Sequence, residues 1–550
     1  MTAPHPHPFW PKDLPGAFTL PATSLHANLR IAAERYPHKP AYVYYGSTLT
    51  WGALRRDAEA LAGWLQQRGG VRRGDRVAVM GQSSPLFATA VHAVLRADAV
   101  VVPLNVMNLG EEIAHCLRDS GARVLVAAQE LMARIAPLLG GLLDHVVVHA
   151  YADALSGAVD EDTPAWVREP LAALPPHAAV VPWAQALGAG LAPAPHAAGP
   201  DDAAAIAYTS GTTGRPKGCL HTHRSLMAAA ITPPLWRGDR PDSVFLGVAT
   251  MFHMQGLQAL IHTPAYLGNT VVLLPRWDAR AAARLIERHR VKLWGVSPAM
   301  LLDLLALPDI DRVDLSSLDI VTGGGAALPA AVNARLEALG VRYLEAWGMT
   351  ETASMAAANP PRRSKRQCLG IPTFGVTLRV ADPASGEPVA DGEAGELWVA
   401  GPQVMKGYWN QPQADAETFC EVDGLRFLRT GDLVTRDAEG YHFLVDRLKR
   451  MINASGYKVW PAEVEAVLHG HPAVQEACVI SSVDARRGES VLAVVVRRAG
   501  CPLEADELIA WARTQMAAYK APRAVRFAER LPRSATGKID WRTLQQQELG

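Results

Sequence analysis

The chain contains 550 residues, of which 49% are hydrophobic and 20% are charged, as in ordinary globular proteins. This length exceeds what one compact core supports, so two or more domains are expected. Lysine plus arginine equals aspartate plus glutamate at 54 each, so the net charge is zero and gives no support for nucleic-acid binding or a general membrane-surface role.

The cysteines are scattered along the chain and form no C-x-x-C pair. Neither a zinc site nor a disulfide framework is therefore indicated, which fits a reducing compartment. Residues 1–16 are rich in proline and histidine and contain no apolar segment, so we expect no secretory signal. No run approaches the roughly 18 apolar residues that a membrane span requires. The sequence predicts a cytoplasmic protein without an integral membrane segment.

Strand-like and helix-like segments alternate through the first third of the chain. We expect buried strands at residues 76–80, 100–104 and 123–127, with helices at 84–97 and 111–119 between them. Repetition of strand, helix and strand predicts parallel sheets that are covered by helices.

The same alternation resumes further along the chain, with strands expected at residues 269–274 and 318–322 and helices at 279–289 and 330–339. Residues 188–200 lie between the two stretches and are dense in alanine, proline, glycine and histidine. This composition is typical of an exposed connection.

A loop rich in glycine and hydroxyl side chains follows an apolar run. Its sequence from Tyr208 to Gly218 is YTSGTTGRPKG. Glycines let backbone N–H groups turn toward a polyanion, hydroxyls add donors, and Lys217 adds a positive charge. The segment predicts a phosphate-binding loop, but not a P-loop, because glycine stands at position 218 where serine or threonine is required. The candidate contacts are Thr209, Ser210, Gly211, Thr212, Thr213, Gly214 and Lys217.

The run GGGAALP at residues 323–329 follows the strand expected at 319–322. Glycines at the carboxyl end of a parallel strand let a ligand lie flat against the backbone. A tight turn between strand and helix is the alternative interpretation. The candidate ligand contacts in this run are Gly324, Gly325 and Ala326.

The segment EAWGMTE at residues 345–351 combines an aromatic ring, a glycine, a hydroxyl and a carboxylate. Trp347 beside Gly348 offers a stacking face for a purine. Thr350 offers a hydroxyl to phosphate, and Glu351 is a hard oxygen ligand suited to Mg²⁺. Core packing for Trp347 and a surface charge for Glu351 are the alternative interpretations.

A β-rich region ends near residues 441–445, and a new unit begins after it. The expected elements of this unit are helices at 461–468 and 508–516 and strands at 477–481 and 491–496. We therefore predict an α/β protein with a large N-terminal domain at residues 1–446, built of parallel, helix-covered sheets and a β-rich subdomain. A small, mobile α+β C-terminal domain follows at residues 447–550, and about a hundred residues is a normal domain size.

Together and in this order, the motifs resemble those of the adenylate-forming superfamily, which contains acyl-CoA synthetases, stand-alone adenylation domains and firefly-type luciferases. The resemblance spans nearly the whole chain. It implies that the loop around Lys217 holds phosphates and that residues 323–329 form one wall of the adenine and acyl pockets. Trp347 stands where tyrosine is commoner, and Asp98 stands where glycine is usual, which puts the backbone geometry there in question.

The resemblance also assigns roles in the last quarter of the chain. Asp432 is implied to accept the ribose hydroxyls, and Arg447 to be a second nucleotide contact. Lys449 occupies the hinge position, and Gly456 lies in the loop that lines the pantetheine tunnel. Lys538 matches the catalytic lysine, with one more solvated lysine as the alternative.

His253 lies in the segment MFHMQGL at residues 251–257 and is implied to be an acyl-pocket residue rather than a proton donor. This segment and the small residues at 323–327 resemble fatty acyl-CoA synthetases more than amino-acid-activating domains. We expect a medium- or long-chain fatty acid as the substrate. An aromatic acid is the alternative, because a wall of glycine and alanine also admits a flat ring.

The resemblance implies a ligase that uses ATP, Mg²⁺ and coenzyme A to convert a carboxylic acid into an acyl-adenylate and then an acyl-CoA thioester. Lys217 and Mg²⁺ would neutralise the departing pyrophosphate, and Lys538 would bridge the carboxylate and the α-phosphate. Thiol attack would then require rotation of the C-terminal domain about Lys449. The alternatives are an enzyme that loads a carrier-protein thiol and a non-catalytic nucleotide sensor. The sequence leaves the oligomeric state open, a homodimer included.

Overall fold

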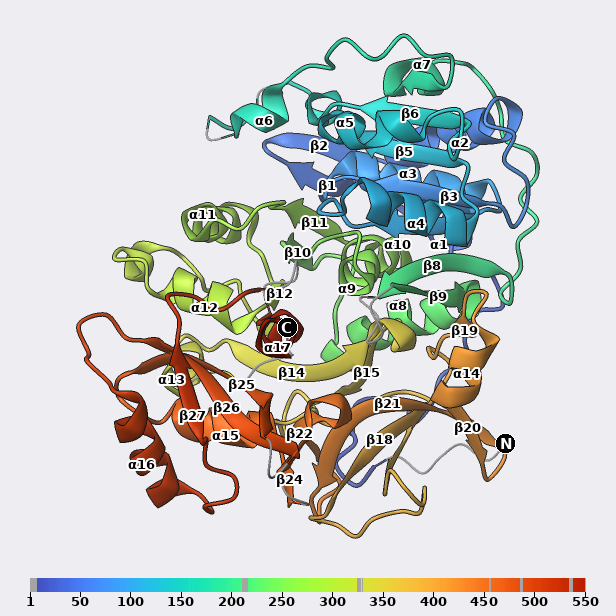
Figure 1. Ribbon diagram of the computed structural model, residues 1–550. Coiled ribbons are helices and arrows are strands. Elements are labelled where there is room, and N and C mark those ends of the chain that lie inside the picture. Colours follow the sequence, from blue (N-terminus) through green and yellow to red (C-terminus); the bar gives the residue numbers. More distant parts are fainter. Residues whose placement is uncertain are drawn as a thin grey trace. The chain divides into compact units, whose positions relative to one another are not determined.

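The computed structural model describes residues 7–157, 159–161, 163–209, 216–323, 328, 330–454, 457–484, 488–533 and 538–549. The chain forms two compact units (Figure 1). The first unit contains Met1–Thr377 and Val399–Leu428, and the second contains Leu378–Trp398 and Arg429–Gly550. The domain boundary expected after residue 446 lies inside the second unit and stays a prediction.

One sheet of the first unit has eight strands. In order they are β19 (Gly407–Tyr408), β9 (Lys217–Thr222), β8 (Ala203–Thr209), β4 (Val100–Leu104), β3 (Arg76–Met80), β5 (Val124–Ala128), β6 (His145–His149) and β7 (Val180–Pro182). The strands from β8 to β7 pair in parallel, whereas β9 pairs antiparallel with β8 and β19. The three strands predicted first are therefore confirmed as neighbours at the centre of a parallel sheet.

A second sheet of the first unit has nine strands. In order they are β16 (Ile371–Pro372), β15 (Ser354–Ala358), β14 (Arg342–Met349), β13 (Ile320–Gly323), β12 (Leu293–Val296), β10 (Val244–Gly247), β11 (Thr270–Leu273), β1 (Pro40–Tyr44) and β2 (Ser47–Thr50). The strands from β14 to β1 pair in parallel, and antiparallel strands close both edges. Strands β11 and β13 confirm the strands that the sequence predicts at residues 269–274 and 318–322.

Helices cover these sheets, as the alternation predicts (Figure 1). They are α1 (His26–Arg35), α2 (Trp51–Gln67), α3 (Pro85–Arg96), α4 (Gly110–Ser120), α5 (Met132–Ile135), α6 (Ala165–Arg168), α7 (Trp183–Leu187), α8 (His223–Arg237), α9 (Met254–Leu257), α10 (Thr263–Leu267), α11 (Ala279–His289), α12 (Pro298–Leu305), α13 (Ala330–Ala338) and α14 (Pro412–Thr418). Local chemistry starts several of them. Ser84 caps α3 by accepting from Phe87 N at 3.2 Å, and Asp278 caps α11 by accepting from Ala281 N at 2.7 Å. None of the described helices is long and apolar enough to cross a membrane.

The second unit contains the small α+β fold that the sequence predicts. Its sheet has the order β24 (Tyr457–Val459), β23 (Ile452–Ala454), β26 (Gly488–Arg497) and β25 (Val474–Asp484), and β27 (Ala524–Phe527) pairs with β26. The helices are α15 (Pro461–Leu468), α16 (Ala505–Gln515) and α17 (Trp541–Leu549). Apolar side chains of α15, β25, β26 and α16 form one buried core.

The predicted β-rich region is a separate five-stranded sheet. It contains β17 (Thr377–Ala381), β18 (Ala394–Ala400), β20 (Phe419–Val422), β21 (Leu425–Arg436) and β22 (His442–Arg447). The long strand β21 pairs antiparallel with β20 through its first residues and with β22 through its last. The pairing with β22 places Asp432 opposite Arg447.

Asp98 adopts the left-handed conformation, with φ at 60°, that glycine would favour at this position. Its carboxylate, 7% exposed, lies 2.5 Å from Nδ1 of His196. It also accepts hydrogen bonds from Ala197 N at 3.0 Å and Ala198 N at 3.1 Å. The far nitrogen of His196 lies 2.6 Å from Ser24 Oγ. Asp98 therefore keeps the backbone conformation that glycine would adopt. Its carboxylate also holds residues 196–198, in the long connection before β8, in place.

Replacing Asp98 by glycine tests whether its carboxylate holds this connection. Glycine relieves roughly 1–2 kcal/mol of conformational cost, but the loss of hydrogen bonds to a carboxylate costs roughly 1.5–3 kcal/mol each. We expect Asp98→Gly to lower the free energy of unfolding by about 1–3 kcal/mol, as measured by urea denaturation. A double-mutant cycle with His196→Ala should give a coupling of roughly 0.5–3 kcal/mol. If the two substitutions lowered the free energy of unfolding additively, Asp98 would not hold the connection through His196.

Candidate active site

The two ends of the predicted phosphate loop are joined by the β8–β9 hairpin, in which Thr209 pairs with Lys217. Thr209 ends β8, and Lys217 begins β9. The residues predicted to contact phosphate between them lie outside the described part of the chain: Ser210, Gly211, Thr212, Thr213 and Gly214. The predicted wall residues Gly324, Gly325 and Ala326 and the tunnel residue Gly456 also lie outside it.

Helix α4 holds both ends of this loop. Its residues His115 and Asp119 are four positions apart and so share one face of the helix. The hydroxyl of Tyr208 donates to Asp119 Oδ2 at 2.6 Å, and His115 Nε2 lies 3.3 Å from Pro216 O. Burial and the Asp119 carboxylate raise the pKa of Tyr208, so its phenol stays neutral and remains a donor. The sequence predicts this helix at residues 111–119, but not its contacts with the loop, because the contacting residues come from distant segments.

Trp347 and Gly348 lie where β14 runs into the turn that carries Glu351. Trp347 is buried, and the strand pairing shifts register between Trp347 and Gly348. A Cβ at Gly348 would lie 1.5 Å from Ser354 O, so only glycine permits this close approach of β14 and β15. The predicted aromatic and glycine pair therefore sits at a bulge that directs the following residues.

Thr350 and Glu351 are held by backbone contacts to the eight-stranded sheet. Nε2 of His221, in β9, lies 2.8 Å from Thr350 O. Met405 N, just before β19, donates to Glu351 O at 2.7 Å. The turn that carries the predicted metal ligand is therefore fixed against the strand that begins with Lys217.

The side chain of Glu351 is buried, and Tyr408 donates to it. Glu351 is 7% exposed, and the Tyr408 hydroxyl lies 2.9 Å from its Oε1. Nζ of Lys217 lies 5.1 Å from the centre of the same tyrosine ring. Lys217 and Glu351, which the sequence analysis identified separately, are thus brought together around a tyrosine that it missed.

The donor set around Glu351 suits Mg²⁺ bound together with phosphates. Mg²⁺ prefers one or two carboxylates and takes its other ligands from water and substrate phosphates. Across the described residues, no group of three or more histidine, cysteine, aspartate or glutamate side chains could form a self-sufficient metal cage. The single buried carboxylate of Glu351, beside the base of the predicted phosphate loop, fits Mg²⁺ that takes its other ligands from water and substrate phosphates.

His253 precedes α9 and is flanked by buried apolar residues. Among the described residues, its Nε2 is buried without a hydrogen-bond partner, and burial lowers the pKa of the imidazole. The ring is therefore neutral at neutral pH. A Cβ at Gly256 would lie 2.0 Å from Thr250 O, so glycine is needed for α9 to fold back on this segment. The π-helical turn Gln258–His262 follows, and such turns often mark functional sites.

The second unit brings Asp432, Arg447 and Lys538 together. Asp432 on β21 pairs with Arg447 on β22, and Arg447 Nε lies 2.8 Å from Asp432 Oδ1. Asp432 is buried, whereas half of the Arg447 side chain is exposed. Lys538 is exposed, but desolvation by nearby atoms and the Arg447 charge lower its pKa, while Asp432 acts in the opposite direction. These residues form one cluster of alternating charge.

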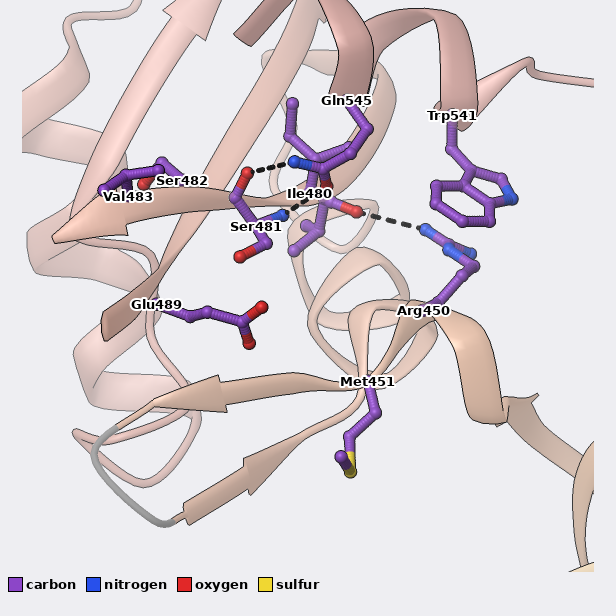
Figure 2. Close-up of a pocket in the computed structure, with 10 residues that line it drawn as sticks. Arg450, Met451, Ile480, Ser481, Ser482, Val483, Glu489, Trp541 and Gln545 are labelled. Atoms are coloured by element: carbon purple, nitrogen blue, oxygen red, sulfur yellow. Dashed lines mark hydrogen bonds between the residues drawn. The ribbon is translucent and has the colours of Figure 1, made fainter. Parts of the chain in front are cut away.

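The segment after the predicted hinge residue Lys449 is anchored in the second unit. Lys449 lies in the short helix Leu448–Arg450. Arg450 forms an ion pair with Glu465, donates to Val479 O at 3.2 Å and lies 5.8 Å from the Trp541 ring centre. Figure 2 shows Arg450 next to Trp541, and both line a cavity of about 240 Å³ together with Met451 and Ser481. These contacts tie Arg450 to α15, β25 and α17.

The model of the AMP-binding enzyme family matches residues 29–409, and the model of the AMP-binding enzyme C-terminal domain matches residues 463–538. The chain therefore belongs to the AMP-binding enzyme family. A solved structure, ATP-bound MatB from Rhodopseudomonas palustris, is similar with a TM-score of 0.83 and 28% identity over 96% of this chain and 99% of that one.

Characterised relatives cover nearly the full chain. The feruloyl-CoA synthase of Amycolatopsis sp is 37% identical over 509 residues, 92% of this chain and 95% of the relative. The long-chain-fatty-acid–CoA ligase of Bacillus subtilis is 33% identical over 548 residues, 98% and 97% of the two chains. The fatty acid–[acyl-carrier-protein] ligase ScoC of Streptomyces coeruleorubidus is 34% identical over 538 residues, 96% of each. The chain is an adenylate-forming acid–thiol ligase.

Replacing Tyr208 by phenylalanine tests the contact between α4 and the phosphate loop. The change removes only the hydroxyl that donates to Asp119, and a hydrogen bond to a charged group contributes roughly 1.5–3 kcal/mol. We expect ATP to bind about tenfold or more weakly in calorimetry, with an unchanged fold by circular dichroism. Equal ATP affinity in wild type and Tyr208→Phe would show that the loop does not depend on this contact.

Proposed function

We propose that this ligase activates a medium- or long-chain fatty acid with ATP and transfers the acyl group to coenzyme A. The observation that carries the proposal is the placement of Lys217 and Glu351 around Tyr408. A cationic lysine at the base of a phosphate loop, beside a buried carboxylate suited to Mg²⁺, is what a metal-bound triphosphate requires.

In the first half-reaction, the acid attacks the α-phosphate and pyrophosphate leaves. The backbone and hydroxyls of the loop from Thr209 to Gly214 would cradle the phosphates, and Lys217 would neutralise the leaving group. Glu351 would hold Mg²⁺, which supplies charge neutralisation at the phosphate oxygens when bound. The Trp347 ring would stack on adenine, and the Thr350 hydroxyl would donate to phosphate.

The charge cluster of the second unit supplies the remaining contacts in this proposal. Asp432 would accept the ribose hydroxyls, with Arg447 as its neighbour at the nucleotide. Lys538 would bridge the substrate carboxylate and the α-phosphate, where two negative groups approach each other. For thiol attack, rotation about Lys449 would withdraw Lys538 and bring forward the loop that contains Gly456.

The proposed substrate follows from the segment around His253. Met251, Phe252 and Met254 beside it are buried and apolar, and its own imidazole is neutral. Such surroundings favour an alkyl chain, since each buried CH₂ contributes about 0.8 kcal/mol. The relatives that act on long-chain fatty acids support this choice, while the feruloyl-CoA synthase keeps an aromatic acid as the second candidate and ScoC keeps a carrier protein as the alternative acceptor.

A cytoplasmic location is part of the proposal. The six cysteines of the chain are all free, and four of them are buried: Cys116, Cys219, Cys368 and Cys478. Reduced cysteines are the rule in the cytoplasm.

Replacing Lys538 by alanine separates the two half-reactions. We expect acid-dependent exchange of pyrophosphate into ATP to fall at least ~100-fold, because the charge that joins carboxylate and α-phosphate is lost. Thioester formation from supplied acyl-adenylate should stay near the wild-type rate. Lys538→Arg keeps the charge with a different geometry and serves as the matched variant. Equal loss of both half-reactions would indicate a structural role.

The substrate proposal is tested by kcat/KM for a series of straight-chain acids beside ferulate and benzoate, with coenzyme A as acceptor. We expect kcat/KM to rise through the medium-chain acids until the pocket ends, because each added CH₂ increases apolar burial. A clear preference for the aromatic acids would overturn the fatty-acid proposal. Turnover with an acyl-carrier protein but not with coenzyme A would overturn the proposed acceptor.

A further inference from the structure

Tyr408 occupies a short strand whose position is fixed from both sides. β19 pairs with β9, with Tyr408 opposite Cys219. The backbone N of Tyr408 donates to Asp415 Oδ1 at 2.7 Å, and a Cβ at Gly407 would lie 2.3 Å from the other Asp415 oxygen. The neighbouring Trp409 N donates to Gly218 O at 2.7 Å. The backbone that carries the tyrosine ring is therefore held in place beside β9.

The chemistry of Tyr408 is set by the carboxylate that it contacts. Burial and the charge of Glu351 raise the pKa of the Tyr408 phenol, so the hydroxyl keeps its proton. A neutral phenol donates one hydrogen bond, here to Glu351 Oε1 at 2.9 Å. Its π-face attracts a cation, and Lys217 Nζ lies 5.1 Å from the ring centre. The Tyr408 side chain thus contacts the predicted metal ligand Glu351 through its hydroxyl and the predicted phosphate ligand Lys217 through the face of its ring.

We propose that Tyr408 is a positioning residue that sets the spacing between Lys217 and Glu351 and orients the Glu351 carboxylate for Mg²⁺ bound with ATP. The inference rests on the proposed function and adds a residue to it. The hydrogen bond from the Tyr408 hydroxyl restricts rotation of the buried Glu351 carboxylate. A contact that orients a metal ligand in this way strengthens the metal site.

Tyr408→Phe tests the proposal, because it keeps the ring beside Lys217 and removes only the donor to Glu351. Binding of α,β-methylene-ATP, measured by calorimetry over a wide range of Mg²⁺ concentration, reports the site without turnover. Loss of an outer contact to a metal ligand typically costs about 10–100-fold in metal affinity or activity. We expect half-saturation to require at least about tenfold more Mg²⁺, and pyrophosphate exchange at low Mg²⁺ to fall in proportion.

Tyr151→Phe is the matched control. The buried Tyr151 hydroxyl donates to Glu130 Oε1 at 2.5 Å, so the control removes the same kind of bond elsewhere in the first unit. It should leave the Mg²⁺ dependence of nucleotide binding unchanged. An equal Mg²⁺ shift in both variants would reduce the effect to general stability and overturn the proposal.

Glu351→Gln approaches the same contact from its other partner, and combining it with Tyr408→Phe gives a double-mutant cycle. We expect this variant to raise the Mg²⁺ requirement, and Tyr408→Phe in its background to add little. Independent, additive losses would overturn the proposal. If wild type binds nucleotide and exchanges pyrophosphate but Tyr408→Phe matches it, only this inference fails. If wild type does neither with any acid, the proposed function fails as well.

Discussion

The site of the first unit depends on the burial of one carboxylate. Glu351 is almost fully removed from water, and a buried negative charge is costly unless donors or cations compensate it. The Tyr408 hydroxyl and the nearby Lys217 supply part of that compensation. Strand β9, the edge strand β19 and the tight turn after β14 have to meet for these contacts to form, so the β9–β19 pairing and the bulge in β14 serve the same requirement.

The second unit meets a comparable requirement with a different arrangement. Asp432 is buried opposite Arg447 on paired strands, and Lys538 adds another cation within electrostatic range. A cluster with two cations and one anion has spare positive charge for a phosphate or a carboxylate. Arg450, which follows the proposed hinge residue Lys449, is tied to α15 by its ion pair with Glu465 and to β25 by its hydrogen bond to Val479 O.

Local patterns in the sequence were enough to predict most elements of the fold. Helix α11 begins and ends at the predicted residues because Asp278 caps it, and α15 does so because Pro461 opens its first turn. Motifs likewise singled out Lys217 and Glu351, which both contact Tyr408, and Asp432 and Arg447, which form an ion pair; their roles stay predictions. Tyr408 and the α4 residues were missed because their importance depends on contacts between segments far apart in the chain. The αL conformation of Asp98 was also beyond reach, since a sequence gives the unusual residue but not its φ angle.

The central claim is that the protein forms an acyl-adenylate before it forms a thioester. The most direct measurement mixes enzyme in excess with ATP, Mg²⁺ and a medium-chain fatty acid and follows pyrophosphate and AMP before and after coenzyme A is added. We expect pyrophosphate release and an enzyme-bound acyl-adenylate without coenzyme A, followed by AMP and acyl-CoA once the thiol is present. Pyrophosphate release that does not require the acid, or AMP and acyl-CoA formed without a trapped adenylate, would contradict it.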